Sequence, residues 1–305
     1  MKIIISNQLS VKEEDINKLK EAGYEVGDSF DKVTASDADV IVGSIESNEK
    51  SLENFPNLKF IHILSAGFDK YDLEAMKNRN IIMVNGRGVY SRPIAEYILG
   101  KVLVWAKKDH TFYDQQKRNE WIRYDAEMLE LSGKVVGIFG TGSIGKETAR
   151  LFQAFDCKVL GVNTSGKAVE YFDETFAMED KEIVLKQSDI IVCTLPLSDA
   201  TYHLFGTQEF LTMKKDALFI NIGRGKEVNE AELLEVLDTH LSLVVMDVFE
   251  VEPLPKDSPL WQHSKVIVTP HNSADSDIVD ERQVNYVIGN LLHYIKKEEL
   301  ENRII

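Results

Sequence analysis

The stretch KVVGIFGTGSIGKETARLFQAF, residues 134–155, carries the strongest structural signal in the chain. An apolar run typical of a buried strand leads directly into the pattern GTGSIG, which opens a segment of helical periodicity. A second apolar run, Lys158–Asn163, closes a strand–helix–strand unit of about 30 residues. In this context Gly140 permits a tight turn, Gly142 lets backbone N–H groups approach a pyrophosphate, and Gly145 allows close helix–strand packing. The stretch therefore predicts a Rossmann-type dinucleotide-binding unit.

The start of the predicted helix supplies further donors for an anion. Its first turn contains Ser143 and Ile144. Backbone N–H groups in the first turn of a helix have no partner within the helix, and they carry partial positive charge. We therefore expect these two residues to contact the pyrophosphate of the cofactor.

The residues after the second strand predict which dinucleotide is bound. An NAD site has Asp or Glu here to accept hydrogen bonds from the ribose, whereas this chain has Asn163 followed by Thr164, Ser165 and Lys167. A carboxylate would repel a 2′-phosphate, but an amide, two hydroxyls and an ammonium can bind one. We therefore predict NADP as the preferred cofactor. NAD is the alternative, with Asn163 bonded to the ribose 2′-hydroxyl, because no arginine occupies this turn.

Outside this unit, apolar runs alternate with segments of helical periodicity from end to end. Near-continuous Val, Ile and Leu content is typical of parallel sheets covered by helices on both faces. We therefore predict an α/β fold with doubly wound parallel sheets. The length of 305 residues suggests two domains, with one large α/β domain as the alternative. The runs that predict strands are Lys2–Ser6, Ala38–Ser44, Leu58–Ser65, Ile81–Asn85, Lys134–Gly140, Lys158–Asn163, Asp189–Leu195, Ala217–Ile222, Ser242–Val248 and Lys265–Thr269.

Two long helical segments predict the domain boundaries. One covers about Arg92–Trp121, and we place the crossover between domains near Gly100. The other, about Asp275–Lys297, is long enough to return to the first domain. The predicted domains are thus residues 1–99 with 276–305, and residues 100–275. The role of Arg92 stays open: its side chain can reach the cleft, or it can have a capping or interdomain role.

Capping pairs predict where two other helices begin. Ser10 with Glu13, and Asn229 with Glu232, have the spacing of a capping box. Gly23 is expected to end the first of these helices.

Three ionisable residues stand at the ends of successive predicted strands in the second domain. Arg224 lies in NIGRG, Glu252 in DVFEVEPLP, and His271 ends VIVTPH. The carboxyl ends of parallel strands face the ligand crevice, so these side chains can converge there. Hydride reduction of a 2-oxo acid needs a cation for the substrate and an acid for the developing alkoxide. We predict that Arg224, Glu252 and His271 are the catalytic residues, with histidine exchanging the proton and the carboxylate stabilising the imidazolium.

These motifs resemble those of the NAD(P)-dependent D-isomer-specific 2-hydroxyacid dehydrogenase family. The resemblance covers nearly the whole chain and rests on LSAGFDKYD (residues 64–72), PIAEYIL, LELSGKVVGIFGTGSIG, SDIIVCTLPLSDAT, NIGRGKEVNEAEL, MDVFEVEPLP and TPHNS. It implies that Arg224 anchors the substrate, that His271 is the proton donor and acceptor, and that Glu252 is its partner. The other implied contacts are the substrate carboxylate at Ser65, Ala66 and Gly67, the nicotinamide side at Leu195 and Pro196, and the nicotinamide carboxamide at Asp247.

The resemblance also implies an architecture and an activity. The architecture is a Rossmann-type cofactor domain, a flavodoxin-like substrate domain and an interdomain cleft. The activity is reversible reduction of a small 2-oxo acid to a D-2-hydroxy acid with NAD(P)H. Asn163 departs from the acidic residue of NAD-using members, and Thr164 from the arginine of many NADP-using members. Glu252 argues against formate oxidation, because formate-oxidising relatives have Gln there. A dinucleotide-sensing, corepressor-like protein is the alternative from another class.

Composition excludes several kinds of partner. There are 35 Lys and Arg against 50 Asp and Glu, a net charge of -15, which disfavours nucleic acids and anionic membrane surfaces. Two cysteines are too few for a disulfide framework or a zinc site, and hydride transfer requires no metal. Neither a signal-peptide core nor an apolar stretch of about 18 residues is present, so we expect a cytoplasmic protein. The apolar segment IAEYILGKVLVWA predicts a homodimer.

Overall fold

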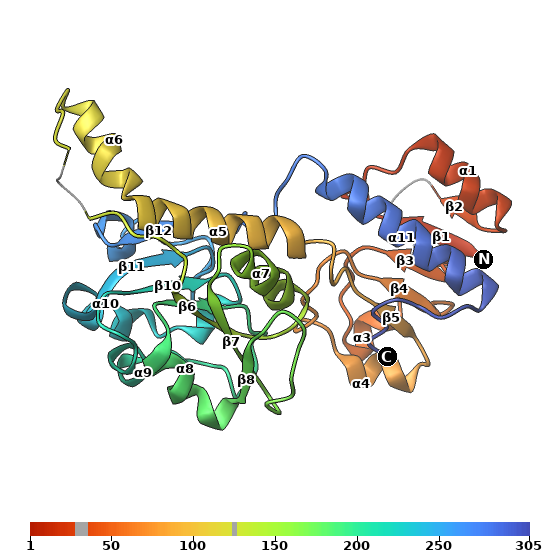
Figure 1. Cartoon of the computed structure of the whole chain (residues 1–305). Helices are drawn as coiled ribbons and strands as arrows, with labels where there is room; N and C mark the ends of the chain where they lie inside the picture. The colour runs from red at the N-terminus through yellow and green to blue at the C-terminus, as the bar shows by residue number, and fades with distance from the viewer. Residues whose placement is uncertain (28–35, 124–126) are drawn as a thin grey trace. The chain divides into compact units, whose positions relative to one another are not determined.

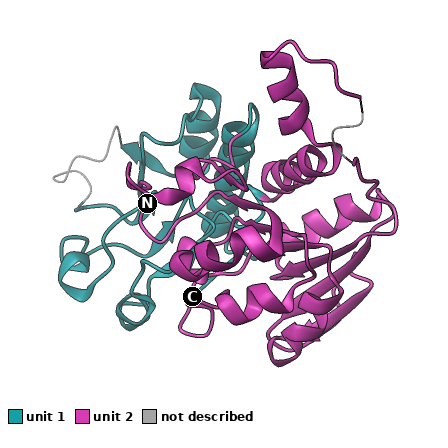
Figure 2. Cartoon of the chain, turned by 90° about the vertical axis from the view of Figure 1, so that its left-hand side faces the viewer, with its two compact units in different colours: residues 1–90, 276–305 teal, residues 91–275 magenta. Residues whose placement is uncertain are grey.

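The computed structural model describes residues 1–27, 36–123 and 127–305. It divides into two compact units, which Figure 2 shows in different colours: unit 1 is residues 1–90 with 276–305, and unit 2 is residues 91–275. Each unit is an α/β structure with one parallel sheet. Within the described residues, no helix is both long enough and apolar enough to cross a membrane.

Unit 1 contains a five-stranded sheet of order β2-β1-β3-β4-β5, in which every pairing is parallel. This is the flavodoxin-like strand order. The strands are β1 (Lys2–Ile5), β2 (Glu25–Gly27), β3 (Val40–Val42), β4 (Phe60–His62) and β5 (Ile82–Val84). The helices are α1 (Glu13–Glu21), α3 (Glu49–Leu52), α4 (Leu73–Asn78) and α11 (Val279–Lys296).

Both faces of this sheet are covered by helices. Successive residues of a strand point to opposite faces, and β1 shows this directly. Ile3 belongs to the apolar cluster that contains Leu19 of α1 and Leu291 of α11. Ile4 belongs to the cluster that contains Leu52 of α3. Because α11 comes from the C-terminal part of the chain, residues from both ends of the chain complete unit 1.

Unit 2 contains a seven-stranded parallel sheet of order β12-β11-β10-β9-β6-β7-β8. Counted from β6, this is the Rossmann strand order with one strand added at the β12 edge. The direction of winding reverses between β6 and β9, where such folds bind their ligands. The strands are β6 (Val135–Phe139), β7 (Lys158–Asn163), β8 (Glu174–Ala177), β9 (Ile190–Cys193), β10 (Ala217–Asn221), β11 (Leu241–Met246) and β12 (Val266–Val268).

Helices cover both faces of the second sheet as well (Figure 1). On one face, Phe139, Phe219 and Met246 of the strands pack with Leu185 of α8 and Leu237 of α10. Fully burying one such side chain contributes roughly 1.5–3 kcal/mol. Helices α5 and α7 pack against each other and contact β10 and β6. The helices of unit 2 are α5 (Ser91–Lys107), α6 (Asp109–Lys117), α7 (Ser143–Gln153), α8 (Lys181–Gln187), α9 (Thr207–Thr212) and α10 (Glu230–His240).

The predicted fold class is confirmed, and some local expectations are corrected. The segment Arg92–Trp121 forms two helices, because Lys108 has a φ of 58° in the left-handed region and interrupts the helical path. The capping box at Ser10 is wrong, since α1 begins after Lys12 and has no side-chain cap. The cap at Asn229 is confirmed, because its Oδ1 accepts the backbone N–H of Glu232 at 3.2 Å.

Candidate functional site

The glycine loop lies between β6 and α7, as predicted. Gly140 has a φ of 102°, which favours glycine, and a Cβ on Gly145 would stand 1.9 Å from the carbonyl oxygen of Gly140. The start of the helix is thus pressed against the loop. Among the described residues, nothing lies within 4 Å of a Cβ placed on Gly142, so a ligand can approach the backbone there. Ser143 and Ile144 occupy the first turn of α7, and these features fit a bound pyrophosphate.

The side chain of Asn163, at the end of β7, is used within its own turn. Its Nδ2 donates to the carbonyl oxygen of Lys167 at 3.0 Å and lies 3.2 Å from Thr141 Oγ1. Its Oδ1 accepts the N–H of Ser165 at 3.1 Å. Asn163 therefore shapes the turn, while the side chains of Thr164, Ser165 and Lys167 are exposed.

Leu195 and Pro196 follow β9, which is the sheet neighbour of β6. They lie beside the glycine loop, because the Oγ1 of the preceding Thr194 donates to the carbonyl oxygen of Gly140 at 3.0 Å. The carbonyl oxygen of Pro196 accepts the hydroxyl of Thr201 at 2.8 Å, which holds the loop. The two residues are placed at the same sheet edge as the predicted pyrophosphate site.

The three predicted catalytic residues follow three neighbouring strands. Arg224 comes after β10, Glu252 after β11 and His271 after β12. Nδ1 of His271 lies 2.8 Å from Oε2 of Glu252. With Nδ1 bonded to the carboxylate, Nε2 is the ring nitrogen that can exchange a proton with a substrate. The guanidinium of the half-buried Arg224 donates from Nη1 to the carbonyl oxygen of Gly223 at 2.8 Å.

The loop that carries Glu252 is fixed to the start of α10 by a reciprocal pair of hydrogen bonds. The N–H of Glu250 donates to Oε1 of Glu230 at 2.7 Å, and the N–H of Glu230 donates to Oε1 of Glu250 at 3.0 Å. Burial raises the pKa of Glu230, and the nearby charge of Glu250 adds to this effect. The exchange of two backbone–carboxyl bonds holds the loop two residues before Glu252.

Asp247 fixes the turn that carries His271. Its Oδ1 accepts the hydroxyl of Thr269 at 2.6 Å and the N–H of Asn272 at 3.1 Å, and its Oδ2 accepts the N–H of Ser273 at 3.0 Å. The carboxylate is fully buried and bonds to the chain on both sides of His271. His271 itself has a φ of 52°, so the turn needs external support.

Tyr97 extends this network from α5. Its hydroxyl lies 2.5 Å from Thr269 Oγ1, and since Thr269 donates to Asp247, Tyr97 is the donor to Thr269. Burial is the main cause that raises the pKa of Tyr97 to about 12. Sequence reasoning did not single out Tyr97 or Thr269, although both lie in motifs, AEY and TPH, that were recognised.

The predicted carboxylate-binding residues lie in unit 1, in the loop after β4. The hydroxyl of Ser65 donates to the carbonyl oxygen of Gly67 at 2.7 Å, and the amide of Asn85 donates to the carbonyl oxygen of Ala66 at 2.5 Å. Within the described part of the chain, the backbone N–H groups of Ala66 and Gly67 donate to no protein acceptor. Two adjacent N–H groups of this kind can bind a carboxylate.

Arg92 is used inside unit 2. Its guanidinium bonds to Oε1 of Glu96 at 2.5 Å on α5 and to Oε1 of Glu147 at 2.8 Å on α7. Arg150, and after it Arg92, lower the pKa of Glu147 to about 2. Arg92 therefore joins α5 to α7 within unit 2, a role that the sequence analysis did not predict.

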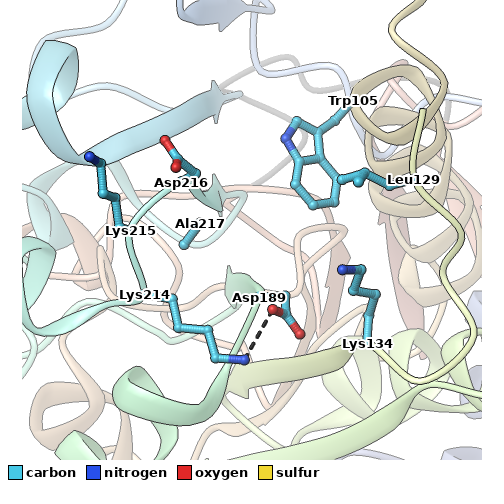
Figure 3. A pocket seen from close by; sticks show the side chains of 8 residues that line it. All are labelled: Trp105, Leu129, Lys134, Asp189, Lys214, Lys215, Asp216 and Ala217. Carbon is cyan, nitrogen blue, oxygen red and sulfur yellow. Dashed lines mark hydrogen bonds and ion pairs between the residues drawn. The ribbon is translucent and has the colours of Figure 1, made fainter. Parts of the chain in front are cut away.

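A cavity of about 190 Å³ lies at the opposite, amino-terminal edge of the second sheet (Figure 3). It is lined by Trp105, Lys134 and Ala217 among others, and Lys214 bonds to Asp189 beside it at 3.0 Å. Lys134, Asp189 and Lys214 precede β6, β9 and β10, whereas the predicted catalytic residues follow the carboxyl ends of the strands. The described residues contain no group of three or more His, Cys, Asp or Glu side chains that could hold a metal ion.

The chain is similar to known proteins over most of its length. Residues 99–273 match the family described as D-isomer specific 2-hydroxyacid dehydrogenase, NAD binding domain. The chain is 32% identical over 266 residues to glyoxylate/hydroxypyruvate reductase B of Enterobacter sp. (strain 638), which covers 85% of this chain and 82% of that protein. A D-isomer specific 2-hydroxyacid dehydrogenase family protein from Aeromonas salmonicida is similar in structure, with a TM-score of 0.83, 28% identity and coverage of 100% and 98%. An NADPH-dependent glyoxylate/hydroxypyruvate reductase from Sinorhizobium meliloti, solved with NADP and sulfate, has a TM-score of 0.81, 27% identity and coverage of 99% and 98%.

Proposed function

The chain belongs to the D-isomer specific 2-hydroxyacid dehydrogenase family, and from this membership we propose its substrates, its preferred cofactor and the residues that act. It is an NAD(P)-dependent oxidoreductase of 2-oxo and 2-hydroxy acids. The proposed substrates are small 2-oxo acids such as glyoxylate and hydroxypyruvate, which are reduced to D-2-hydroxy acids. The observation that carries the assignment of residues is the 2.8 Å contact between His271 and Glu252. The dinucleotide-sensing alternative is not favoured.

The proposed roles follow from the chemistry of carbonyl reduction. A bound reduced nicotinamide supplies a hydride to the carbonyl carbon. As the carbon–oxygen double bond becomes a single bond, His271 gives its Nε2 proton to the carbonyl oxygen. Glu252 stabilises the imidazolium that carries this proton, and Arg224 binds the substrate carboxylate and polarises the carbonyl. In the reverse direction His271 accepts the hydroxyl proton.

The two units are proposed to divide the binding of substrate and cofactor. Unit 1 is the proposed substrate domain, with Ser65, Ala66 and Gly67 at the carboxylate. Unit 2 is the proposed cofactor domain, with the pyrophosphate on the glycine loop. The N–H groups of Ala66 and Gly67, which have no protein acceptor among the described residues, support the first assignment. The open approach to Gly142 supports the second.

NADPH is the proposed hydride donor. The exposed hydroxyls of Thr164 and Ser165 and the exposed ammonium of Lys167 can together bind a 2′-phosphate. Asn163 contributes by shaping the turn, and it avoids the repulsion that a carboxylate would exert on that phosphate. The similarity to an NADPH-dependent reductase from Sinorhizobium meliloti adds support.

A homodimer is proposed, on a different surface from the one that the sequence suggested. Much of the apolar surface of α5 is buried within unit 2, including Ile98, Val102 and Trp105. Large exposed apolar side chains lie instead on the arm, which we define as α6 and the described residues from there to 128. Figure 1 shows α6 standing beyond the end of α5. The exposed fractions on the arm are 62% for Tyr113, 95% for Trp121, 45% for Ile122 and 56% for Met128.

We propose that a second copy of the chain covers the arm. Exposed aromatic and aliphatic side chains of this size usually mark an interaction surface.

The cytoplasm is the proposed location. The two cysteines, both free and buried, are compatible with a reducing compartment.

The test is turnover of each cofactor with glyoxylate, hydroxypyruvate, pyruvate and longer 2-oxo acids, followed by the loss of reduced-nicotinamide absorbance. In His271→Ala, kcat for reduction should fall roughly 10²–10⁴-fold, the usual contribution of a positioned general acid. Binding of NADPH, measured by fluorescence, should survive. Unchanged turnover in this variant contradicts the assignment of His271, and a wild-type protein that binds NADPH but reduces no 2-oxo acid favours the sensing role.

A further inference from the structure

Glu227 is a fully buried carboxyl group three residues after Arg224, in the short 3₁₀ turn Gly225–Glu227. Its Oε2 accepts the backbone N–H of Arg224 at 2.9 Å and the thiol of Cys193 at 3.1 Å. Burial, and then the carboxyl of Glu227, hold the pKa of Cys193 well above its usual range, so this thiol keeps its proton and can donate it. The carboxyl oxygen thus connects the end of β9 to the loop after β10.

The local chain is built to admit this carboxyl group. A Cβ on Gly223 would stand 2.4 Å from Oε2 of Glu227, so a larger residue at 223 would displace the carboxyl. Burying a carboxyl group is costly unless hydrogen bonds compensate, and an apolar side chain would fill the same volume without that cost. A protein core departs from apolar packing in this way mainly where function requires it.

The hydrogen bonds of Glu227 act on the backbone of Arg224 from one side, and Asn221 acts from the other. The amide of Asn221 donates to the carbonyl oxygen of Arg224 at 2.9 Å, and its Oδ1 accepts the N–H of Gly223 at 3.0 Å. Both the N–H and the C=O of Arg224 are therefore bonded to buried side chains. Such bonds fix where the guanidinium is presented.

We infer that Glu227 is a positioning residue for Arg224: its carboxyl group holds the loop so that the guanidinium meets the carboxylate of the 2-oxo acid. This inference rests on the proposed function, in which Arg224 binds that carboxylate. Glu227 contacts neither substrate nor cofactor in this scheme, and it acts through the backbone of Arg224.

The experiment compares Glu227→Met, which removes the acceptor, with Glu227→Gln, which keeps an acceptor oxygen at the same reach. Glu232→Met is the matched control, because Glu232 also accepts a backbone N–H, that of Thr207 at 2.6 Å, away from Arg224. In Glu227→Met we expect KM for the 2-oxo acid, and the inhibition constant of the unreactive analogue oxamate, to rise about 10-fold. Glu227→Gln should restore most of this loss, and NADPH binding should be unchanged in all three variants.

Amide hydrogen exchange of residues 221–228 reports on the loop without any turnover. Exchange should be faster in Glu227→Met than in the wild type and in Glu232→Met. Wild-type exchange in Glu227→Met overturns the inference, and so does faster exchange with unchanged oxamate affinity. A wild-type protein that neither reduces a 2-oxo acid nor binds oxamate contradicts the proposed function instead, while the exchange comparison still decides whether Glu227 fixes the backbone of Arg224.

Discussion

Glu252 holds the imidazole of His271 with one carboxylate oxygen and the backbone of its own loop with the other. Oε2 lies 2.8 Å from Nδ1 of His271, and Oε1 accepts the N–H of Phe249 at 3.0 Å. The carboxylate is thus held from both sides, and it fixes which ring nitrogen of His271 faces outward. A charge held in this way favours the protonated imidazole that reduction requires.

Glu252→Gln should lower kcat for reduction. Gln keeps the shape and an acceptor oxygen but removes the negative charge that stabilises the imidazolium, so the proton on Nε2 of His271 is held less well for transfer to the carbonyl oxygen. The measurement is kcat for reduction, with NADPH binding followed by fluorescence beside it. Glu298→Gln is the control, because Glu298 lies 3.8 Å from His293, away from the predicted catalytic residues. A kcat equal to that of the wild type contradicts the assigned partnership.

Lys167→Ala should weaken the use of NADPH and leave the use of NADH nearly unchanged. A hydrogen bond to a charged group contributes about 1.5–3 kcal/mol, which corresponds to roughly a 10- to 100-fold loss in kcat/KM. Asn163→Asp should also favour NADH, since the new carboxylate repels the 2′-phosphate and accepts bonds from the ribose. Lys186→Ala is the matched control, because Lys186 is an exposed lysine that pairs with Glu182. Equal losses with both cofactors in Lys167→Ala contradict this reading of the turn.

Tyr97→Phe should lower kcat while changing KM for the 2-oxo acid little. It removes the hydroxyl that donates to Thr269 and thereby loosens the turn that carries His271. One hydrogen bond contributes about 0.5–1.5 kcal/mol, so we expect a loss of roughly 3- to 10-fold. Tyr113→Phe, at an exposed tyrosine on the arm, is the control. A change in KM alone would argue against a role in positioning His271.

Trp121→Ser should convert the proposed dimer to monomers at micromolar concentration. An aromatic side chain that anchors an interface contributes at least about 2 kcal/mol, so the dissociation constant should rise about 30-fold. Light scattering after size-exclusion chromatography measures the mass directly. Leu211→Ser removes another exposed apolar side chain, on α9, and should leave the mass unchanged. A wild-type protein that is monomeric under the same conditions contradicts the dimer.

His62 should make the protein less stable in acid. Burial lowers its pKa to about 4 and outweighs the opposing effect of the carbonyl oxygen of Ile63, which lies 3.1 Å from Nδ1. Nε2 faces the amide Nδ2 of Asn290 at 3.4 Å. The unfolded chain, with a pKa near 6.5, binds the proton more readily. The stabilisation is therefore present above pH 6.5 and is lost as pH falls toward 4, by about 3 kcal/mol.

Urea unfolding of the wild type and of His62→Gln at pH 7 and pH 4 measures this contribution. The variant should lose less stability than the wild type between the two pH values, because it has no buried imidazole to protonate. Equal losses in the two proteins contradict the assignment to His62.

The strands of the fold could be predicted where their residues are mainly apolar and not where polar residues interrupt a short strand. The run Lys158–Asn163 is identical to β7, because a strand paired on both sides and covered on both faces must be apolar throughout. The edge strands β2 (Glu25–Gly27) and β8 (Glu174–Ala177) were missed, since they pair on one side and contain polar residues. The break between α5 and α6 at Lys108 was also missed, because no glycine or proline stands at that position.

In the candidate site too, some residues could be predicted from the sequence and others could not. The sequence predicted that Arg224, Glu252 and His271 follow strand ends, because apolar runs mark the strands and the three side chains are ionisable. Tyr97 is bonded to a residue 172 positions away, and Glu227 to a thiol 34 positions away. No local pattern encodes such distant partners, so these supporting residues emerge only from the folded chain.

The position of α11 in the sequence determines the order in which the two units can fold during synthesis. The apolar face of the first sheet, which includes Ile3, is covered partly by Leu291 of α11. That helix leaves the ribosome only after all of residues 91–275 have been made. We therefore expect unit 2 to fold before unit 1 is complete. Until α11 has been made, this apolar face of the first sheet stays exposed in the nascent chain, where chaperones can bind it.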